Sequence, residues 1–182
     1  MDFKTIKSGD KVFNAIFKHM QYIGYYTIYE RFNITADDLV KFSVIFNDTF
    51  ELYKTGKLEI NGIITYFNKK RINILKWVHS IPVNQKLALA DKKNCGGDIP
   101  FTIQTINIAL YCYAMIADMV LIEHFNFITK NVNKFNNELN YYIDSYTRKQ
   151  PGLKDTYLHD IDIQDWFVEE FRFDIKAGLE VL

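Results

Sequence analysis

The stretch that decides the fold runs from Asp98 to Phe125, and its centre at 106–122 reads INIALYCYAMIADMVLI. Apolar side chains recur three and four residues apart along it and form two stripes on different faces of a helix. The first stripe consists of Ile103, Ile106, Leu110, Tyr113, Ala117, Val120 and His124, and the second of Ile108, Cys112, Met115, Met119 and Ile122. A helix that is apolar on two faces belongs inside a protein or a membrane.

The interior of a protein is the better match for this helix. A membrane span needs about 20 apolar residues, and the clean run is short for that. Asp118 near its end would be costly in lipid, and the flanking residues Asp98 and Glu123 are acidic where positive charge is expected. Asp98 is well placed as an N-cap, and Pro100 falls at the first turn, where its missing N–H costs nothing. The stretch therefore predicts a buried central helix over about 100–125.

One polar line runs along the predicted helix through Asn107, Tyr111, Ala114 and Asp118, because eleven residues nearly close three turns. The simplest interpretation is a solvent-exposed edge, or a carboxylate satisfied by a neighbouring hydroxyl or Lys. A buried polar track is the alternative. A site carboxylate with a raised pKa is a further interpretation, which the sequence alone does not justify adopting.

The N-terminal segment predicts an amphipathic helix that Ser8 or Asp10 opens. Its apolar positions at helical spacing are Val12, Phe13, Ile16, Phe17 and Met20. Gly24 is a suitable stop for this helix. The next segment, 25–34 (YYTIYERFNI), fits either a strand or a short helix.

A second helix has clear signals at both ends. Thr35 and Asp38 resemble a capping box, with Asp replacing the usual Glu, and Gly56 ends the helix. The segment 57–67 then allows two structures. Its Asn-Gly pair at 61–62 is a strong hairpin signal, yet its isoleucines and Phe also have helical spacing. We favour a helix, because both flanks are helical and an isolated hairpin is only marginally stable.

The rest of the chain predicts further short helices. One covers 72–79, and Asn84 is expected to cap the next. After the central helix we expect a break near 126–133 and another helix over 135–146. The predicted fold is a mainly α, compact helical bundle around the central helix, with one small β-hairpin as the alternative at 57–67. The whole chain, 1–182, is expected to form a single domain.

Composition narrows the functional classes. The net charge is zero, so no global field draws the protein to nucleic acid or to an anionic membrane. The two cysteines, Cys95 and Cys112, have no metal or redox spacing and suit a reducing compartment. The segment 1–13 lacks an uninterrupted apolar run, so no secretory signal is recognised and a cytoplasmic location is expected.

Charge is nevertheless unevenly distributed. The segment 54–93 has nine basic and two acidic residues, a net charge of +7, and 155–182 has eight acidic and two basic residues, a net charge of −6. The plainest interpretation is that two solvated faces attract each other within the fold. Alternatively, the basic segment holds a phosphate backbone through Lys69, Lys70, Arg71, Lys86, Lys92 and Lys93. The acidic segment, in turn, would occupy a basic groove on another protein, as nucleic acid does, through Asp160, Asp162, Asp165, Trp166, Glu169 and Glu170.

Catalytic and metal-binding motifs are missing from the sequence. Its histidines have neither HxxxH nor HExxH spacing, and the cluster around His159 matches no metal site. No nucleotide-binding glycine motif is present, so neither a metal nor a cofactor is predicted. A helix-turn-helix over 85–110 is disfavoured, because its loop is long and its second helix is too apolar for a DNA groove.

These observations favour a non-enzymatic protein-binding module. The excess of Ile, Asn, Lys, Phe and Tyr is typical of AT-rich coding, as in a low-GC bacterium or its phage. With the small size, this suggests an anti-CRISPR-like inhibitor from a phage or mobile element, whose partner is a host nuclease or its nucleic-acid complex. The alternatives are a nucleic-acid-binding protein using 54–93, and a small enzyme with a site near Asp118, His124 or His159. No membrane partner is expected, and a homodimer is left open.

Overall fold

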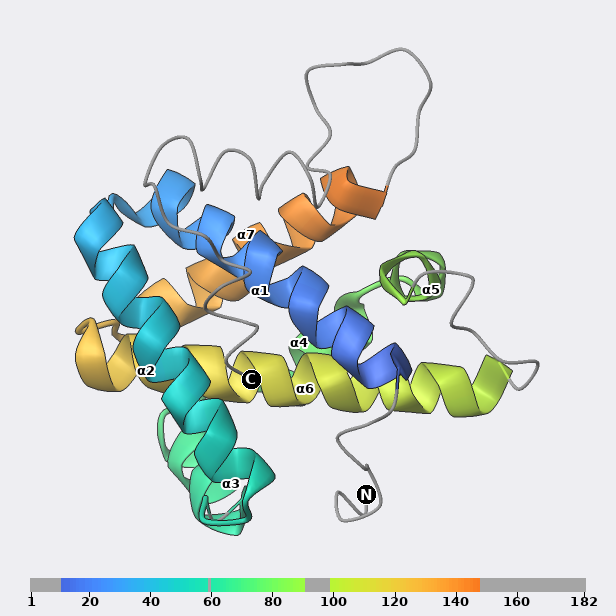
Figure 1. Cartoon of the computed structure of the whole chain (residues 1–182), viewed down its shortest axis with the longest axis horizontal. Coiled ribbons are helices and arrows are strands. Elements are labelled where there is room, and N and C mark those ends of the chain that lie inside the picture. Colours follow the sequence, from blue (N-terminus) through green and yellow to red (C-terminus); the bar gives the residue numbers. More distant parts are fainter. Residues whose placement is uncertain (1–10, 59, 91–98, 148–182) are drawn as a thin grey trace.

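The computed structural model describes residues 11–58, 60–90 and 99–147, and this part of the chain contains seven helices and no strand (Figure 1). The helices are α1 (Lys11–Phe32), α2 (Ala36–Lys54), α3 (Ile60–Lys69), α4 (Ile74–Ser80), α5 (Val83–Leu89), α6 (Ile99–His124) and α7 (Thr129–Thr147). The predicted helical bundle is confirmed. The segment 60–69 is helix α3, so the Asn-Gly pair lies in a first turn and forms no hairpin.

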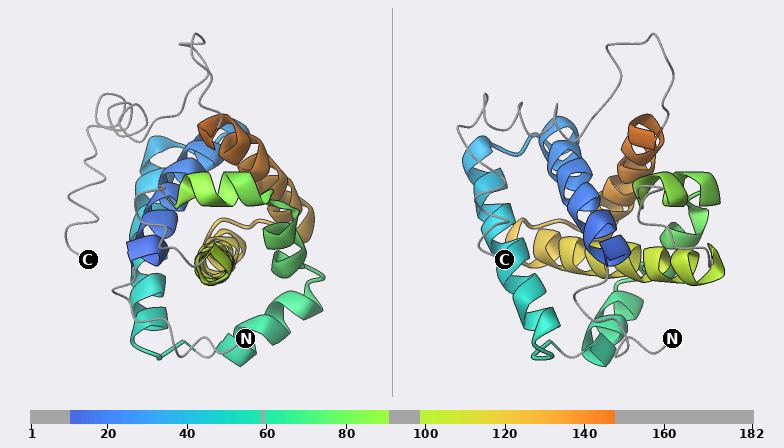
Figure 2. Two further views of the ribbon diagram at one scale, coloured as in Figure 1. Left: turned by 90° about the vertical axis from the view of Figure 1, so that its right-hand side faces the viewer. Right: turned by 45° about the vertical axis from the view of Figure 1, so that its right-hand side comes forward.

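Helix α6 is the predicted central helix. Figure 2 looks along it in the left panel, where the other helices surround it. Helices α1, α2, α4, α5 and α7 all contact α6, and sixteen of its 26 residues are buried. By length and composition alone α6 could cross a bilayer, but most of its apolar stretch is buried within the bundle. Pro100 is its second residue, as expected, whereas the predicted cap Asp98 lies outside the described residues.

Helix α1 continues well beyond the stop expected at Gly24. The helix runs to Phe32, so 25–32 is helical and the stop prediction is wrong. A Cβ atom at Gly24 would lie 1.6 Å from the hydroxyl oxygen of Tyr113, which is fully buried on α6. The glycine therefore permits two helices to cross closely. The helix ends instead at Asn33, whose φ of 56° is left-handed.

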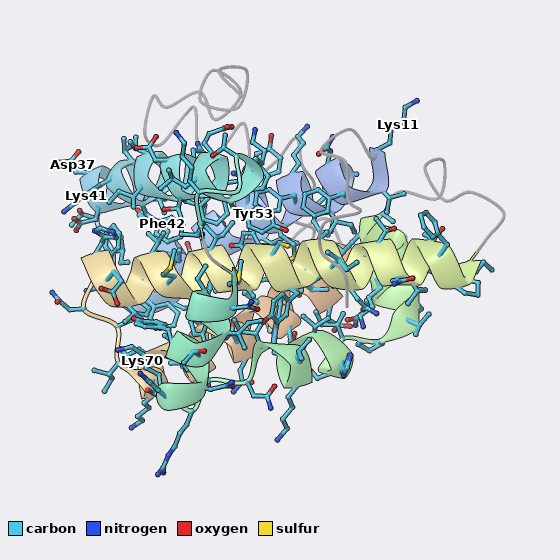
Figure 3. The ribbon with its side chains drawn as sticks, turned by 90° about the horizontal axis from the view of Figure 1, so that it is seen from below. Lys11, Asp37, Lys41, Phe42, Tyr53 and Lys70 are labelled. Carbon is cyan, nitrogen blue, oxygen red and sulfur yellow. The ribbon has the colours of Figure 1, made fainter. Side chains whose placement is uncertain are left out.

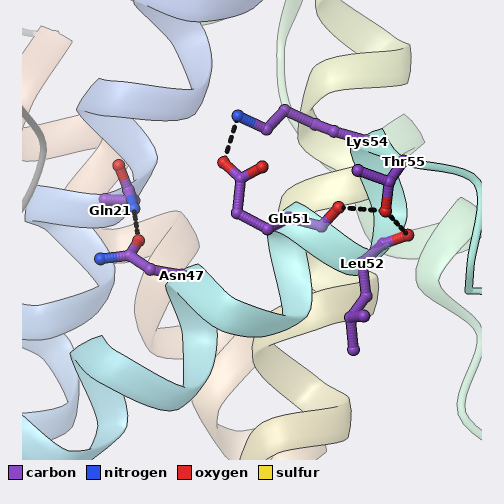
Figure 4. A network of polar contacts seen from close by, with 6 residues as sticks. All are labelled: Gln21, Asn47, Glu51, Leu52, Lys54 and Thr55. Carbon is purple, nitrogen blue, oxygen red and sulfur yellow. Dashed lines mark hydrogen bonds and ion pairs between the residues drawn. The ribbon is translucent and has the colours of Figure 1, made fainter. Parts of the chain in front are cut away.

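Helix α2 has both predicted end signals. The Asp38 backbone N–H donates to Thr35 Oγ1 at 3.2 Å, and the Thr35 hydroxyl donates to Asp38 Oδ2 at 2.9 Å. At the other end Gly56 has a φ of 70°, which favours glycine. Figure 4 shows the Gln21 amide donating to Asn47 Oδ1 at 3.0 Å, which joins α1 to α2.

The shorter helices cover the remaining sides of α6. Helix α4 corresponds to the predicted 72–79 segment, and Asn73 caps it by accepting from the Lys76 N–H at 2.9 Å. The predicted Asn84 cap is wrong, because Pro82 is the N-cap of α5 and Asn84 lies in the first turn. The expected break after α6 is confirmed, although α7 already begins at Thr129.

Candidate functional site

Asp118 is the only buried carboxylate among the described residues, with none of its surface exposed. Asn136 Nδ2 of α7 donates to Asp118 Oδ2 at 2.9 Å. The backbone oxygen of Asn136 accepts from Trp77 Nε1 of α4 at 2.7 Å, so three helices meet here. Tyr111 and Ala114 are buried as well. The exposed-edge interpretation is therefore wrong, and the line is a buried polar track whose carboxylate pairs with an amide.

In its pair with Asn136, Asp118 favours the protonated, neutral form of its carboxyl group. Burial raises the pKa of Asp118 to about 8, and the hydrogen bond from Asn136 offsets only part of this rise. Asp118 Oδ1 and Asn136 Oδ1 are both buried acceptors with no donor among the described residues. When Asp118 is protonated, its carboxyl has an O–H group, and this group supplies the hydrogen-bond donor that Asp118 Oδ1 and Asn136 Oδ1 otherwise lack. The pair is therefore best suited to holding helices together.

The groups considered for catalysis are not brought together. Asp118 faces the interior, whereas His124 is exposed at the end of α6. His19 contacts the backbone oxygen of Leu89 at 2.7 Å, and His79 is exposed on α4. Within the described ranges no three His, Cys, Asp or Glu side chains gather as metal ligands. His159, the third residue proposed for an enzyme site, lies outside the description.

Cys112 is a buried thiol whose Sγ lies 3.0 Å from the hydroxyl of Tyr53. Burial raises the pKa of the Cys112 thiol to about 12, and the contact with Tyr53 opposes the rise. Because the thiolate is the nucleophilic form, this cysteine is poorly suited to nucleophilic chemistry at neutral pH.

The basic residues expected to hold a phosphate backbone are only partly grouped. Lys69 is the last residue of α3, Lys70 and Arg71 form the turn after it, and Lys69 and Arg71 are exposed. Lys86 is only 4% exposed, and burial lowers the pKa of its ammonium. The prediction that Lys86 belongs to an exposed basic surface is therefore wrong. It assumed that every lysine is solvated, whereas a lysine side chain can be buried. Lys92 and Lys93 lie outside the described residues.

Other cations join the turn after α3 from elsewhere in the chain. Thr129 at the start of α7 donates its hydroxyl to the Lys70 backbone oxygen at 3.1 Å. This contact brings the first turns of α7, with exposed Lys130 and Lys134, to the turn after α3. In Figure 3, Lys41 of α2 lies on the other side of the same end of α6 from Lys70. We call this set the cationic end; its members are Lys41, Lys69, Lys70, Arg71, Lys130 and Lys134.

A second surface, which we call the Tyr–Arg surface, joins the end of α1 to α7. Arg31 Nε lies 3.2 Å from Glu138 Oε2. The Arg31 guanidinium carbon also lies 5.6 Å from the ring centroid of Tyr141 and 5.4 Å from that of Tyr142. Tyr141 is 58% exposed. The sequence interpretation missed this surface, although the helical spacing of Glu138, Tyr141 and Tyr142 was a signal for one shared face.

The six residues proposed for protein binding in the acidic segment, from Asp160 to Glu170, lie outside the described part of the chain. Comparison with known proteins finds no matching family model, no similar curated protein and no similar solved structure.

Proposed function

We propose that the protein is a non-enzymatic module that binds another protein, and that the Tyr–Arg surface is its main contact. The observation that supports this is the exposure of Tyr141 beside an arginine already held by Glu138, Tyr141 and Tyr142. Tyr and Arg are among the residue types that dominate binding energy at interfaces. A partner that covers this surface meets side chains whose positions are already restricted, which lowers the entropy cost of binding.

In its specific form, the proposal is an inhibitor from a phage or mobile element that acts on a host nucleic-acid-handling complex in the cytoplasm, as an anti-CRISPR protein does. Its support is the AT-rich residue usage and the acidic segment at 155–182, which would compete for a basic groove. No membrane partner is part of the proposal. A homodimer remains an alternative use of the Tyr–Arg surface.

The proposal is tested by capturing partners from the native host with the full chain and quantifying them by mass spectrometry. The Tyr141→Ser variant removes an exposed ring. We expect it to lower recovery of the specific partner at least tenfold, as loss of a hot spot worth about 2 kcal/mol implies. The purified partner is then assayed for nuclease activity with and without the protein.

The control is Val44→Ser on α2, which removes another large exposed apolar side chain. It is expected to retain capture. The proposal is rejected if no protein is enriched over a mock capture, or if the two variants lose the partner equally. Light scattering of the purified chain, with and without Tyr141→Ser, reports whether a second copy is the partner.

Nucleic-acid binding is the second candidate function. The specific observation in its favour is the convergence of the α3 turn and the start of α7 through the Thr129–Lys70 hydrogen bond. This contact adds exposed lysines to a group that the sequence alone confined to 54–93. The first candidate needs the Tyr–Arg surface, and the second needs only the cationic end.

A further inference from the structure

The cationic end is built from three separate parts of the chain around the last turn of α6. The last residue of α3 and the turn after it supply Lys69, Lys70 and Arg71, α7 supplies Lys130 and Lys134, and α2 supplies Lys41. Lys130 and Lys134 are four residues apart and therefore neighbours on one helix face. Lys41 and Lys70 are labelled at the same end of the molecule in Figure 3, far from Lys11.

Three of these lysines lie over aromatic rings. The Nζ atom of Lys70 is 4.9 Å from the ring centroid of Tyr66, that of Lys134 is 5.2 Å from Phe32, and that of Lys41 is 5.8 Å from Phe125. The ring of Phe32 in turn lies 5.0 Å from that of Phe127. Cation–π contacts of this kind restrict flexible lysines without neutralising them. The charges are therefore partly ordered before any ligand arrives.

The cationic end has more positive charge than its surroundings can balance. None of its six cations forms an ion pair with a carboxylate among the described residues. Two of the carboxylates on the same elements already accept hydrogen bonds, Asp38 from Thr35 and Glu123 from the Tyr66 hydroxyl. Glu138, four residues after Lys134 on α7, is already paired with Arg31. Set against Asp37, Asp38 and Glu123, the six cations leave an excess of three positive charges. The C-terminus of α6 contributes only about half a negative charge.

We propose that the cationic end binds the phosphate backbone of a nucleic acid, which deepens the second candidate function above by defining its surface. Five of the six cations are lysines, which act as point charges toward phosphate and need no bidentate geometry. The hydrogen bond from Thr129 to Lys70 brings Lys130 close to the end of α3, so a strand of phosphates can contact Lys70 and Lys130 together. Phosphate contacts position a nucleic acid without reading its bases, so binding is independent of base sequence and strongly dependent on salt.

The test measures binding of the full chain to fluorescent oligonucleotides of random sequence, as single-stranded DNA, duplex DNA and RNA. Wild type is expected to bind at least one of them at about 50 mM salt and to lose affinity steeply as salt rises. The Lys70→Glu, Lys130→Glu double variant is expected to bind at least tenfold more weakly. The slope of log affinity against log salt should become shallower by about two, one for each lost phosphate contact.

The matched control is the Lys11→Glu, Lys18→Glu double variant on α1. It changes the net charge by the same amount as the first double variant. Lys18 also lies over a tyrosine ring, with its Nζ 5.6 Å from the Tyr22 centroid. It should bind within twofold of wild type. If the first variant melts early, Lys70→Gln with Lys130→Gln replaces it, and the change in salt slope remains the measured quantity.

Three results would overturn the proposal. They are failure of wild type to bind any oligonucleotide, an equal loss in both double variants, and binding of polyglutamate as tight as that of nucleic acid, which would assign the surface to an acidic protein. Capture of a protein partner through Tyr141 is measured separately, so either proposal can fail without the other.

Discussion

At the scale of single residues, Asp118 best separates what the sequence can and cannot predict. Its place in a polar line follows from helical periodicity, so the line itself was visible. Whether the line faces solvent depends on Asn136 and Trp77, which approach from α7 and α4. No local pattern around Asp118 indicates those partners. The sequence therefore predicts where Asp118 lies on the helix, but not whether it is buried or which residues it contacts.

Replacing Asp118 by Asn tests whether the acid is neutral in the folded protein. The folded-state pKa of about 8 lies above the value of about 4 for an unfolded chain. The Asp118 carboxyl therefore makes its full contribution to the free energy of unfolding below about pH 4, and this contribution is lost as the pH rises toward 8. An amide preserves the neutral pairing with Asn136. We expect Asp118→Asn to change stability little near pH 4 and to raise it by several kcal/mol, on the order of 1.4 per pH unit crossed, near pH 8.

Urea unfolding of both proteins between pH 4 and pH 9 measures this difference. The wild-type curve should fall relative to the variant across that window and run parallel to it above. A constant difference at every pH would mean that Asp118 does not titrate between the folded and unfolded states as proposed.

At the scale of helices, the termini were predictable where their signals are local. Thr35 and Asp38 cap α2, and Gly56 follows its end, because the interactions lie within a few residues. Gly24 was misinterpreted as a stop because its reason is Tyr113, far along the chain on α6. A glycine within a helix is unfavourable by about 1 kcal/mol, so the sequence pattern favours a helix end unless a crossing partner is known.

The crossing at Gly24 predicts the effect of Gly24→Ala. The new Cβ would lie 1.6 Å from the Tyr113 hydroxyl oxygen and 2.9 Å from Tyr113 Cζ. The Tyr113 ring is held by Phe17 and Phe46, with centroids at 6.0 and 5.5 Å, so it cannot move aside easily. We expect overpacking to destabilise the protein by about 1–3 kcal/mol, less the gain in helix propensity.

The Tyr113→Phe variant removes the nearest clashing atom and is the matched background for this test. Thermal and urea unfolding of the two single variants and the double variant give their coupling. Part of the loss from Gly24→Ala should be recovered in the double variant. Additive effects, or a stabilising Gly24→Ala, would contradict the close crossing.

At the scale of the whole molecule, the bundle follows from α6. A helix that is apolar on two faces needs partners on every side, and five of the described helices contact it. The cationic end and the Tyr–Arg surface, in contrast, could not be predicted from the sequence of α6. The cationic end combines residues near 41, 70 and 130, and the Tyr–Arg surface combines α1 with α7. Charge counting along the chain could find only the segment that happens to be contiguous.

Amide hydrogen exchange across α6 tests most directly whether this helix is the buried centre of the bundle. The amides of 106–121 are predicted to be among the slowest to exchange in the protein, opening only with global unfolding, while those of α3 exchange faster. Exchange at 106–121 as fast as in α3 would contradict a buried, central position for α6.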